Sequence, residues 1–409
     1  MWTVVKLSDV ATLSSGGTPS KANAAFWDGD IPWISPKDMK FNHVTDAEDK
    51  ITRAAVSESA ARIVGSNSVL AVVRSGILAH TFPVATLARE VSFNQDIKAI
   101  TPKNGSLLPA FLFWMLKGQE AQILRIGVKK GATVHSLSNG FLESLRFFLP
   151  PLDEQRRIVG LLDRAAEIRR RADAARGRAR AIIPALFLDT FGDPATNPKG
   201  WPVVTVGDLL ESAAYGTSQK AHDSGERIPM IRMGNVTTGG QLDTIDLKHI
   251  AISGPEREKA ELLEGDLLFN RTNSKELVGK TGLWDGRFEA VAASYFIRLR
   301  VKRDLSSPSY LWSFFNTRYM KRALFDTARG AIGQANINAK ELRAFRVAAP
   351  PLDLQAAFAD QTQRLEALAR HLDAAAAKAE AMAAGLSAEV FGAGERKEAA
   401  SADGSLAPC

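Results

Sequence analysis

The stretch PPLDEQRRIVGLLDRAAEIRRRADAARGRARAIIPALFLDTFG, from Pro150 to Gly192, decides the fold of this chain. It comes back as PPLDLQAAFADQTQRLEALARHLDAAAAKAEAMAAGLSAEVFG from Pro350 to Gly392, at an offset of 200 residues without a gap. In both copies the apolar positions step by three and four residues, which places one seam along a helix. We expect two rods of about 35 residues and roughly 50 Å, since ordinary domain helices have only about 11 residues.

The expected seam positions are the same in the two rods. In the first rod they are Ile158, Leu161, Ala165, Ile168, Ala172, Ala175, Ala179, Ile182 and Leu186. In the second rod they are Phe358, Gln361, Leu365, Leu368, Leu372, Ala375, Ala379, Met382 and Leu386. Pro184 lies inside the first rod and is expected to kink it or end it early, because proline has no N–H and clashes with the preceding turn.

The two rods are expected to pair with each other in antiparallel orientation. Residues 153–189 hold nine Arg against six carboxylates, whereas 353–389 hold two Arg and one Lys against six carboxylates, so the charges are complementary. Pairing about Ala172 and Leu372 sets small residues of the first rod against large ones of the second, as a close-packed seam requires. The alternative is two separate amphipathic helices, each lying on its own domain.

The repeat extends into the segment that precedes each rod. WTVVKLSDVATLSSGGTPS from Trp2 is matched by WPVVTVGDLLESAAYGTSQ from Trp201, at an offset of 199. IPWISPKDM at Ile31 answers IPMIRMGNV at Ile228, and LPAFLFWMLKG and SPSYLWSFFNT follow in the same order. The chain is therefore a duplicated unit, in which a globular head is followed by a rod.

Each head mixes short β-branched or alternating runs with one helical stretch, which predicts an α/β (α+β) fold with a bent sheet. The expected strands are 69–73, 97–100, 267–269 and 295–301, and the expected helices are 109–117 and 308–316. We expect head one at 1–149, the first rod and a Gly/Pro-rich linker at 150–200, head two at 201–349, the second rod at 350–392 and a disordered tail at 393–409. The two heads are expected to be separated by an antiparallel two-helix coiled coil.

Composition narrows the class of protein. The chain of 409 residues has a net charge of +7 and a pI near 9.4, which fits a polyanionic partner but is shared by many soluble enzymes. Its one cysteine, Cys409, allows neither an intrachain disulfide nor a cysteine metal cluster. With no membrane-length apolar run and no signal-peptide pattern at its start, the sequence predicts a cytoplasmic protein.

No catalytic motif is convincing. The nearest approach to a phosphate-binding loop, SKELVGKT from Ser274, has serine where the mechanism needs its first glycine. There is no dinucleotide fingerprint, no His-Glu-x-x-His and no Asn/Asp-Pro-Pro-Tyr/Phe of the kind an amino-methyltransferase would show, and the six histidines are scattered. We expect a protein that is not an enzyme and that has no cofactor and no metal.

Polar, glycine-containing loops beside apolar strands are the candidate DNA contacts, because Arg, Lys, Asn, Gln, Ser and Thr reach phosphates and base edges. In head one the candidates are Thr18, Ser20, Lys21, Ser35, Lys37, Arg74, Lys129 and Lys130. In head two they are Thr217, Gln219, Lys220, Arg232, Asn235, Asn270, Arg271, Thr272, Asn273, Lys280 and Gln334. The two heads share similar apolar segments but differ in their polar loops, such as VRSG against NRTN. This difference suggests that the two heads read different sequences. Solvated loops, turn-stabilising side chains and neutral drift are the alternative explanations.

The chain resembles the specificity subunits of type I restriction-modification systems. SGGTPS with GDIPWISPKDM, LLFNRTNSKELVGKTG and the two PPLD-x-Q starts of the long helices carry the resemblance, in the order head, rod, head, rod. The resemblance implies that the heads read a bipartite asymmetric site in double-stranded DNA. It also implies that the rods dock two methyltransferase subunits, with restriction and translocation subunits joining for cleavage and no role for a membrane. A stand-alone DNA-modifying enzyme and an architectural DNA-bridging protein are the competing classes.

Overall fold

The chain forms two compact units in the computed structural model, which describes residues 2–131, 134–219, 227–328 and 335–392. Unit 1 comprises Met1–Ala172 and Ala374–Cys409, and unit 2 comprises Asp173–Asp373. Each unit thus combines one head with one half of each long helix. The tail predicted to be disordered and the candidates Lys220 and Gln334 lie outside the described residues.

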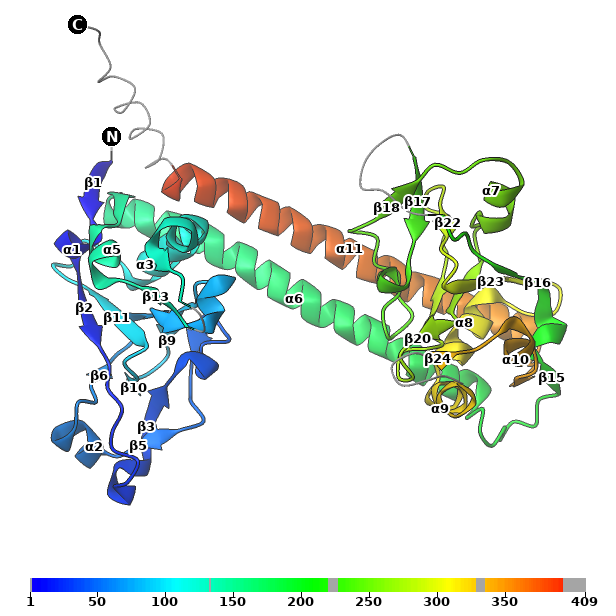
Figure 1. The fold of residues 1–409 in the computed structure, drawn as a ribbon, viewed down its shortest axis with the longest axis horizontal. Coiled ribbons are helices and arrows are strands. Elements are labelled where there is room, and N and C mark those ends of the chain that lie inside the picture. Colours follow the sequence, from blue (N-terminus) through cyan, green and yellow to red (C-terminus); the bar gives the residue numbers. More distant parts are fainter. Residues whose placement is uncertain (1, 132–133, 220–226, 329–334, 393–409) are drawn as a thin grey trace, which may run out of the picture. The chain divides into compact units, whose positions relative to one another are not determined.

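Head one is built on a five-stranded sheet of order β2-β11-β7-β9-β4 and a four-stranded sheet of order β5-β3-β10-β6 (Figure 1). Two smaller sheets, β12-β13-β8 and β1-β14, complete it. Its strands are β1 Thr3–Lys6, β2 Ala11–Ser15, β3 Trp27–Ile34, β4 His43–Val44, β5 Lys50–Ile51, β6 Ile63–Val64, β7 Val69–Val72, β8 Arg74–Ser75, β9 Val84–Leu87, β10 Val91–Phe93, β11 Ile97–Pro102, β12 Val128–Lys129, β13 His135–Leu137 and β14 Arg146–Leu149. Its α-helices are α1 Leu7–Val10, α2 Arg53–Glu58, α3 Pro109–Gly118, α4 Glu120–Gln122 and α5 Asn139–Ser144.

Head two repeats this plan with sheets of order β16-β23-β19-β21, β18-β17-β22, β20-β24 and β15-β25. Its strands are β15 Val203–Thr205, β16 Leu210–Tyr215, β17 Ile228–Ile231, β18 Lys248–Ile250, β19 Leu267–Asn270, β20 Thr272–Asn273, β21 Thr281–Leu283, β22 Val291–Ala292, β23 Phe296–Val301, β24 Ala335–Asn336 and β25 Arg346–Ala348. Its helices are α7 Gly254–Ala260, α8 Pro308–Asn316, α9 Arg318–Thr327 and α10 Ala339–Arg343. The order β16-β23-β19-β21 reproduces β2-β11-β7-β9, which confirms the duplication.

The rods are α6 Leu152–Phe191 and α11 Leu352–Phe391, each a continuous helix of 40 residues (Figure 1). Their halves are antiparallel within each unit. In unit 1 Arg157 interacts with Glu389, and Arg169 Nη1 lies 2.6 Å from Glu380 Oε1. In unit 2 Arg176 Nη1 lies 2.5 Å from Asp373 Oδ1, and the Phe191 ring lies 5.1 Å from that of Phe358, so in each unit residue numbers rise along one helix as they fall along the other. The predicted pairing of opposite charges is present in both contacts.

Half of the predicted seam is wrong. Positions such as Ile158, Ala172 and Ala179 are buried as expected, but Leu161, Ile168 and Ile182 are 40 to 49% exposed. At five places the buried residue comes four positions after a shared seam position rather than three: at Leu162 and Ile183 in α6 and at Thr362, Ala369 and Val390 in α11. The physical reason is that Arg169 and Arg176 occupy two further positions of this kind, where their charged ends meet carboxylates of the facing helix. Leu368 is 49% exposed, so the expected facing of Ala175 and Leu368 is also wrong.

Pro184 does not end α6, which continues to Phe191. The turn after Pro184 is anchored in the core of unit 2, where Phe187 and Phe191 are almost fully buried. Their rings lie 5.9 and 5.1 Å from Phe358 of α11, and Phe187 stacks on Tyr310 at 5.6 Å. Burial of two aromatic side chains offsets the backbone hydrogen bond that proline cannot make.

The glutamine of each PPLD-x-Q motif ties its head to its rod. Gln155 is fully buried; its Oε1 accepts from Leu108 N at 2.9 Å, and its Nε2 donates to the carbonyls of Ser106 and Pro150 at 2.8 Å. Gln355 accepts from Ser306 Oγ and Ser307 N and donates to Pro350 O in the same way. Both glutamines therefore join the start of the rod to the loop that opens the main helix of the head.

Candidate nucleic-acid interface

Three strands of head two end at one edge of its main sheet and carry polar loops there. β16 ends at Tyr215, β19 ends at Asn270, and β23 begins directly after Tyr295, all paired in one register. Arg271 N donates to Tyr295 O at 2.9 Å, and Ser294 N donates to Thr217 O at 2.7 Å. The three loops are therefore held together by backbone hydrogen bonds, which leave the exposed side chains available to a partner.

Arg271 is the most constrained cation of this cluster. Its guanidinium carbon lies 4.9 Å from the centroid of the Tyr215 ring, and its Nε is buried with no hydrogen-bond partner among the described residues. Stacking on an aromatic ring orients a guanidinium without using its terminal N–H groups. Those groups are the ones that could contact a guanine edge or a phosphate.

The small sheet β20-β24 extends the head-two cluster. Thr272 pairs with Asn336 in register, and Thr272 Oγ1 donates to Asn336 Oδ1 at 2.6 Å. Asn273 Nδ2 donates to Asn270 Oδ1 at 2.8 Å. Asn270 and Thr272 are buried, whereas Asn336 is exposed. Asn336 is thus the polar side chain that this sheet presents to solvent.

The corresponding edge of head one presents a row of cations. Lys129 pairs with Ser136, and Ser136 pairs with Arg74, so the side chains of the three residues lie on one face of the sheet β12-β13-β8. Arg74 is exposed, and its Nε lies 3.3 Å from Asp96 Oδ1. Lys130 follows Lys129 and is exposed as well. The row therefore combines three cations, one of them paired.

Thr18, Ser20 and Lys21 follow β2 on an exposed loop of head one. Thr18 Oγ1 donates to Gln95 Oε1 at 2.7 Å, and Gly17 N donates to Phe93 O at 2.9 Å. The backbone of Gly17 lies so close to Ala60 O that a Cβ would be 2.4 Å from that oxygen, which explains the glycine. This loop corresponds to the one that carries Thr217 and Gln219 in head two.

Backbone hydrogen bonds fix how the two heads correspond. Leu137 N donates to Val73 O in head one, and Ile337 N donates to Arg271 O in head two. Arg271 therefore stands at the position of Val73, and Thr272 at that of Arg74. This register agrees with the alignment of NSVLAVVRSG from Asn67 with GDLLFNRTNS from Gly265, whereas matching the two arginines of VRSG and NRTN would shift it by one residue.

Several candidate residues have structural contacts that occupy them. Ser35 is buried and its Oγ donates to Asp38, while Asn235 is buried and donates to the carbonyls of Asp243 and Asp246. Lys280 Nζ donates to the carbonyls of Met233 and Val236, and burial lowers its pKa. These three side chains hold loops of their own heads.

Two further candidates are cations held by carboxylates. Lys37 lies 2.9 and 3.0 Å from Glu48 and Asp49, and hydrogen bonds to these carboxylates raise its pKa. Arg232 lies 3.7 Å from Asp246. Both remain on the surface, but their charge is already balanced within the head.

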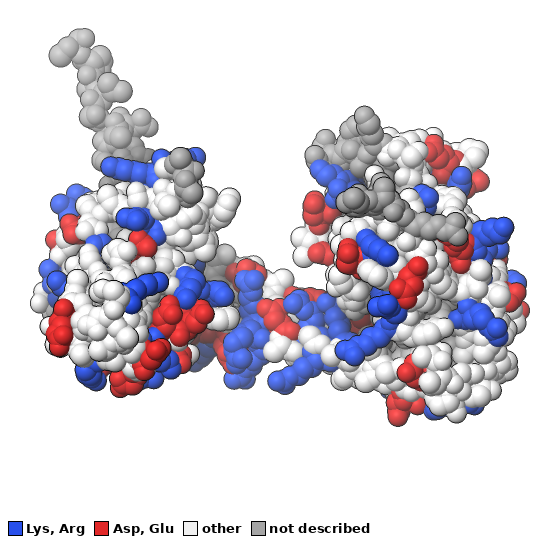
Figure 2. All heavy atoms as spheres, turned by 60° about the horizontal axis from the view of Figure 1, so that its bottom comes forward, with Lys and Arg blue, Asp and Glu red and all other residues white. Residues whose placement is uncertain are grey.

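Charge is mixed over the surface of the heads. Figure 2 shows Lys and Arg side chains interspersed with Asp and Glu on each head, and a denser group of Lys and Arg over the long helices. The polar edges described above therefore stand out by the kind and order of their side chains, since an excess of charge does not distinguish them.

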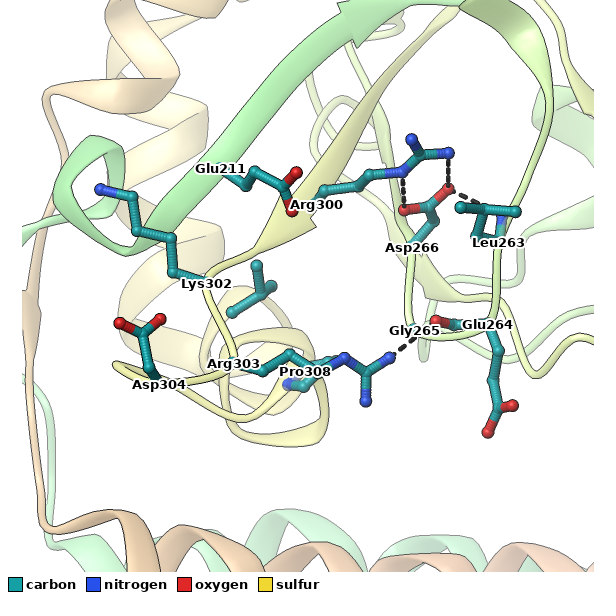
Figure 3. Close-up of a pocket in the computed structure, with 11 residues that line it drawn as sticks. Glu211, Leu263, Glu264, Gly265, Asp266, Arg300, Lys302, Arg303, Asp304 and Pro308 are labelled. Carbon is teal, nitrogen blue, oxygen red and sulfur yellow. Dashed lines mark hydrogen bonds and ion pairs between the residues drawn. The ribbon is translucent and has the colours of Figure 1, made fainter. Parts of the chain in front are cut away.

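A pocket of 530 Å³ lies at the other end of β23, beyond Arg300. Figure 3 shows Arg300 facing Asp266, with Arg300 Nε 3.0 Å from Asp266 Oδ1, and Arg303 directed at the carbonyl of Glu264. The Arg300–Asp266 ion pair neutralises two of the pocket's charged side chains, and the guanidinium of Arg303 is held by a backbone carbonyl. Among the described residues no group of three or more His, Cys, Asp or Glu is arranged to hold a metal ion.

The family comparison agrees with the duplicated architecture. The family model described as "Type I restriction modification DNA specificity domain" matches residues 1–170 and again 198–377. The chain belongs to this specificity-domain family. The two matches cover one head and the beginning of one rod each, which is the repeat found in the sequence and in the sheet order.

Curated relatives of this specificity-domain chain carry consistent names. It is 39% identical over 159 residues to the EcoR124I/EcoR124II specificity subunit of Escherichia coli, 39% of each chain. It is 26% identical over 265 residues to the MjaIX specificity subunit of Methanocaldococcus jannaschii, 60% of each, and 25% identical over 399 residues to the EcoKI specificity subunit of E. coli K12, 90% of this chain and 82% of that one. The first two alignments span less than two thirds of those relatives.

Solved structures of the specificity-domain family show the same fold. The S subunit of a type I restriction-modification system from M. genitalium superimposes with a TM-score of 0.61 at 12% identity, covering 96% of each chain. A chain from a structure entitled as the basis of complex assembly and conformational transition of the type I R-M system gives 0.54 at 19% identity, covering 95% of this chain and 97% of that chain.

Three members of the specificity-domain edges were missed from sequence. Tyr215 supports Arg271, Gln95 accepts from Thr18, and Glu256 of α7 accepts from Thr217. Tyr215 sits in the quoted loop beside the chosen residues, so its spacing could have identified it. Gln95 and Glu256 are distant in sequence from their partners, and no local pattern marks them.

Proposed function

We propose that this chain is the non-catalytic DNA-specificity subunit of a type I restriction-modification complex, in which each head reads half of a bipartite, asymmetric double-stranded target. The observation that carries the proposal is the duplicated polar edge, at which one backbone frame holds different side chains in the two heads. Arg271 replaces Val73, and Thr272 replaces Arg74. Two heads with the same backbone arrangement but different side chains at the contact positions are suited to reading two different half-sites.

The DNA-contacting residues follow from exposure and contacts. In head one we propose Thr18, Ser20, Lys21, Arg74, Lys129 and Lys130, which are exposed at the reading edge. In head two we propose Gln219, Arg271, Asn273 and Asn336, with Thr217 holding the loop. Lys37 and Arg232 remain candidates for phosphate contacts, because phosphate oxygens compete with a surface carboxylate at little cost. Lys220 and Gln334 remain sequence-based proposals.

We propose the same domain limits for the function as the sequence predicts. Segments 1–149 and 201–349 act as the target-recognition domains, and segments 150–200 and 350–392 connect and carry them. No helix among the described residues is long and apolar enough to cross a membrane. We place the protein in the cytoplasm, where its DNA target and a reducing environment coincide.

The partners in the proposal are two methyltransferase subunits, with restriction subunits joining for cleavage. Each unit presents the same exposed sequence positions to such a partner. The α6 stripe of unit 1 consists of Leu161, Arg164, Ile168 and Arg171, and the α11 stripe of unit 2 consists of Gln361, Arg364, Leu368 and His371, all exposed. In the α6 stripe, apolar residues seven apart with a cation three residues after each suit a partner helix that has an apolar seam and an acidic flank. In the α11 stripe, Leu368 is the apolar residue and Arg364 is the cation.

The test compares methylation in cells with binding in solution. The chain and its methyltransferase partner are expressed together, and modified bases are mapped across the genome. We expect one bipartite motif, which disappears when this chain is left out. The purified complex should bind that motif at least about a thousandfold more tightly than random DNA. Methyl transfer by the chain without its partner would instead support a stand-alone enzyme, and binding without base preference would support an architectural protein.

A further inference from the structure

Glu256 is a carboxylate at the reading edge of head two. It lies in the first turn of α7 and is exposed. Its Oε1 accepts from Thr217 Oγ1 at 2.7 Å, and its Oε2 accepts from Gln219 Nε2 at 2.6 Å. Gln219 N in turn donates to Thr217 Oγ1 at 3.2 Å. Glu256 therefore holds the proposed DNA-reading residue Gln219 together with Thr217, which holds the loop.

A negative charge at this place opposes DNA binding. Phosphates repel a carboxylate, and the Coulomb interaction persists over roughly 8 to 10 Å at physiological salt. The next residue, Arg257, pairs with Glu289 on its other side. A carboxylate that lowers affinity in this way needs a compensating role in recognition or folding.

The chemistry of the contact identifies that role. An ionised carboxylate can only accept hydrogen bonds, so the Gln219 side chain must turn its NH₂ group toward Glu256. The two ends of a glutamine amide are otherwise interchangeable in space. Gln219 then keeps a carbonyl oxygen and one N–H, which makes no other side-chain hydrogen bond among the described residues. One acceptor and one donor side by side is the pattern that matches the N6 and N7 edge of adenine.

Head one has no such device. Gly17 N donates to Phe93 O as Thr217 N donates to Ala292 O, so Pro19 occupies the position of Gln219. Thr18 donates to the neutral amide of Gln95 instead of to a carboxylate. Glu256 is thus a feature of the second reader alone, as expected of a group that serves one particular base.

We infer that Glu256 is a positioning residue that fixes the amide of Gln219 for the recognition of adenine at one position of the head-two half-site. The inference rests on the proposed function. It says that the carboxylate trades affinity for selectivity, which a residue that merely stabilises the loop would not do.

The experiment uses the full chain in complex with its methyltransferase partner. Binding of a randomised DNA library is measured for the wild type, Glu256→Gln and Gln219→Ala. Glutamine at 256 can donate as well as accept, so the Gln219 amide is released to both orientations. We expect Glu256→Gln to lose about tenfold or more of the preference for adenine at one head-two position, within the roughly 5- to 150-fold worth of a bidentate contact. Affinity for random DNA should stay equal or rise.

Control measurements separate this inference from the function beneath it. Glu258→Gln removes an equally exposed carboxylate from the same helix and should keep the base preference. Base preferences of the head-one half-site should be unchanged in every variant. If Glu256→Gln retains the adenine preference, or lowers affinity for all sequences together with the melting temperature, the inference is wrong while the specificity function stands. If the wild-type complex shows no base preference, the proposed function itself fails.

Discussion

The guanidinium of Arg271 is held in one orientation, and its terminal N–H groups remain available to a partner. Its ring contact with Tyr215 orients the guanidinium, and its backbone is clamped to Tyr295 and Ile337. Arg271→Ala should weaken binding to the cognate site by about 1 to 3 kcal/mol and relax one base position of the head-two half-site. Competition binding against sites with single substitutions measures this. Equal weakening at every sequence would identify a phosphate contact, and unchanged binding would remove Arg271 from the interface.

Lys321 is a half-buried cation in head two with an unfavourable environment. Its Nζ donates to Gly279 O at 3.0 Å, and burial, aided by Lys280, lowers its pKa to about 8. Because the folded pKa is depressed, the unfolded chain binds more protons between about pH 8 and 10.5, and stability rises with pH across that window. The cost of burying the charge is therefore fully present at pH 7.

Lys321→Met should raise the free energy of unfolding at pH 7 by about 1 to 3 kcal/mol, and the gain should shrink toward pH 10. Gly279 O keeps a donor, because Thr281 Oγ1 also lies 3.0 Å from it. Thermal unfolding at the two pH values measures the difference, with the exposed Lys340→Met as the matched control. A gain that is independent of pH would mean that Lys321 is not destabilised by its charge.

At the residue scale, sequence reasoning placed the candidate loops at strand ends but did not separate their exposed side chains from their buried ones. The loops around Thr18, Arg74, Thr217 and Arg271 do meet at strand ends, because polar residues directly after a buried strand lie at the sheet edge. Asn235 looks the same in sequence, yet it is buried and binds backbone carbonyls. The difference depends on contacts with residues 8 and 11 positions away, which no local pattern reports.

Among the elements, the length of the two rods was predicted closely, but the residues that each rod turns toward the other were predicted only in part. The shared seam positions were identified, but the second line of the seam lies one residue further along. The apolar side chains of Leu161 and Ile168 favoured the residue three positions after each shared seam position. In the structure Arg169 and Arg176, which lie four positions after it, pair with the facing helix instead. Hydrophobic spacing alone cannot decide this, because it assumes that long cations avoid a helix interface.

The α6 and α11 stripes should matter for assembly and little for folding. Ile168→Glu together with Leu368→Glu should reduce retention of the methyltransferase partner by more than tenfold, since each change places a carboxylate in the centre of an apolar contact. Co-purification and analytical ultracentrifugation measure this, and the melting temperature of the isolated chain should stay within a few degrees. Leu305→Glu, at a similarly exposed site in head two, is the control. Full retention by the double variant would place the docking surface elsewhere.

Gln355 should be among the most sensitive polar residues of α11. Gln355→Leu leaves Ser307 N and Pro350 O without their buried partner, which should cost about 2 to 4 kcal/mol of unfolding free energy. Denaturant unfolding measures the loss. Gln361→Leu, on the exposed face of the same helix, should cost less than about 0.5 kcal/mol. Equal effects of the two changes would contradict a joining role for Gln355.

For the whole molecule, the duplication could be predicted from the sequence, but the division into compact units could not. A linear division into heads and rods follows from composition, whereas compact unit 1 takes residues from two distant parts of the chain. Phe391 shows why: its ring lies 5.4 Å from Phe111 of head one, although 280 positions separate them. Which end of which rod meets which head is a tertiary property that helix spacing does not encode.

Residues 1–200 alone should form a two-fold dimer that binds a palindromic version of the head-one half-site. Phe191 of a second copy stands at the repeat position of Phe391 and can fill the same place against Phe111. Arg176 would meet Asp173 instead of Asp373, but Arg169 would meet Arg180 instead of Glu380. The dimer should therefore tighten with moderate salt, because screening weakens that repulsion.

Sedimentation of this fragment across a salt series, without DNA, measures the association. A monomer at every salt concentration would contradict the idea that one rod can stand in for the other. A dimer that loosens with salt would contradict the charge argument and leave the antiparallel pairing intact.

Unit 1 is built from two segments of the chain, and the ribosome makes these two segments at different times. Val390 and Phe391 belong to the core of head one, yet the ribosome makes them after all of unit 2. At about 5 to 20 residues per second, the interval between Ala172 and Phe391 is roughly 10 to 45 s. Head one therefore waits with an open apolar face while head two, encoded later, completes first. The newborn chain is most exposed to chaperones and proteases at the end that emerged earliest.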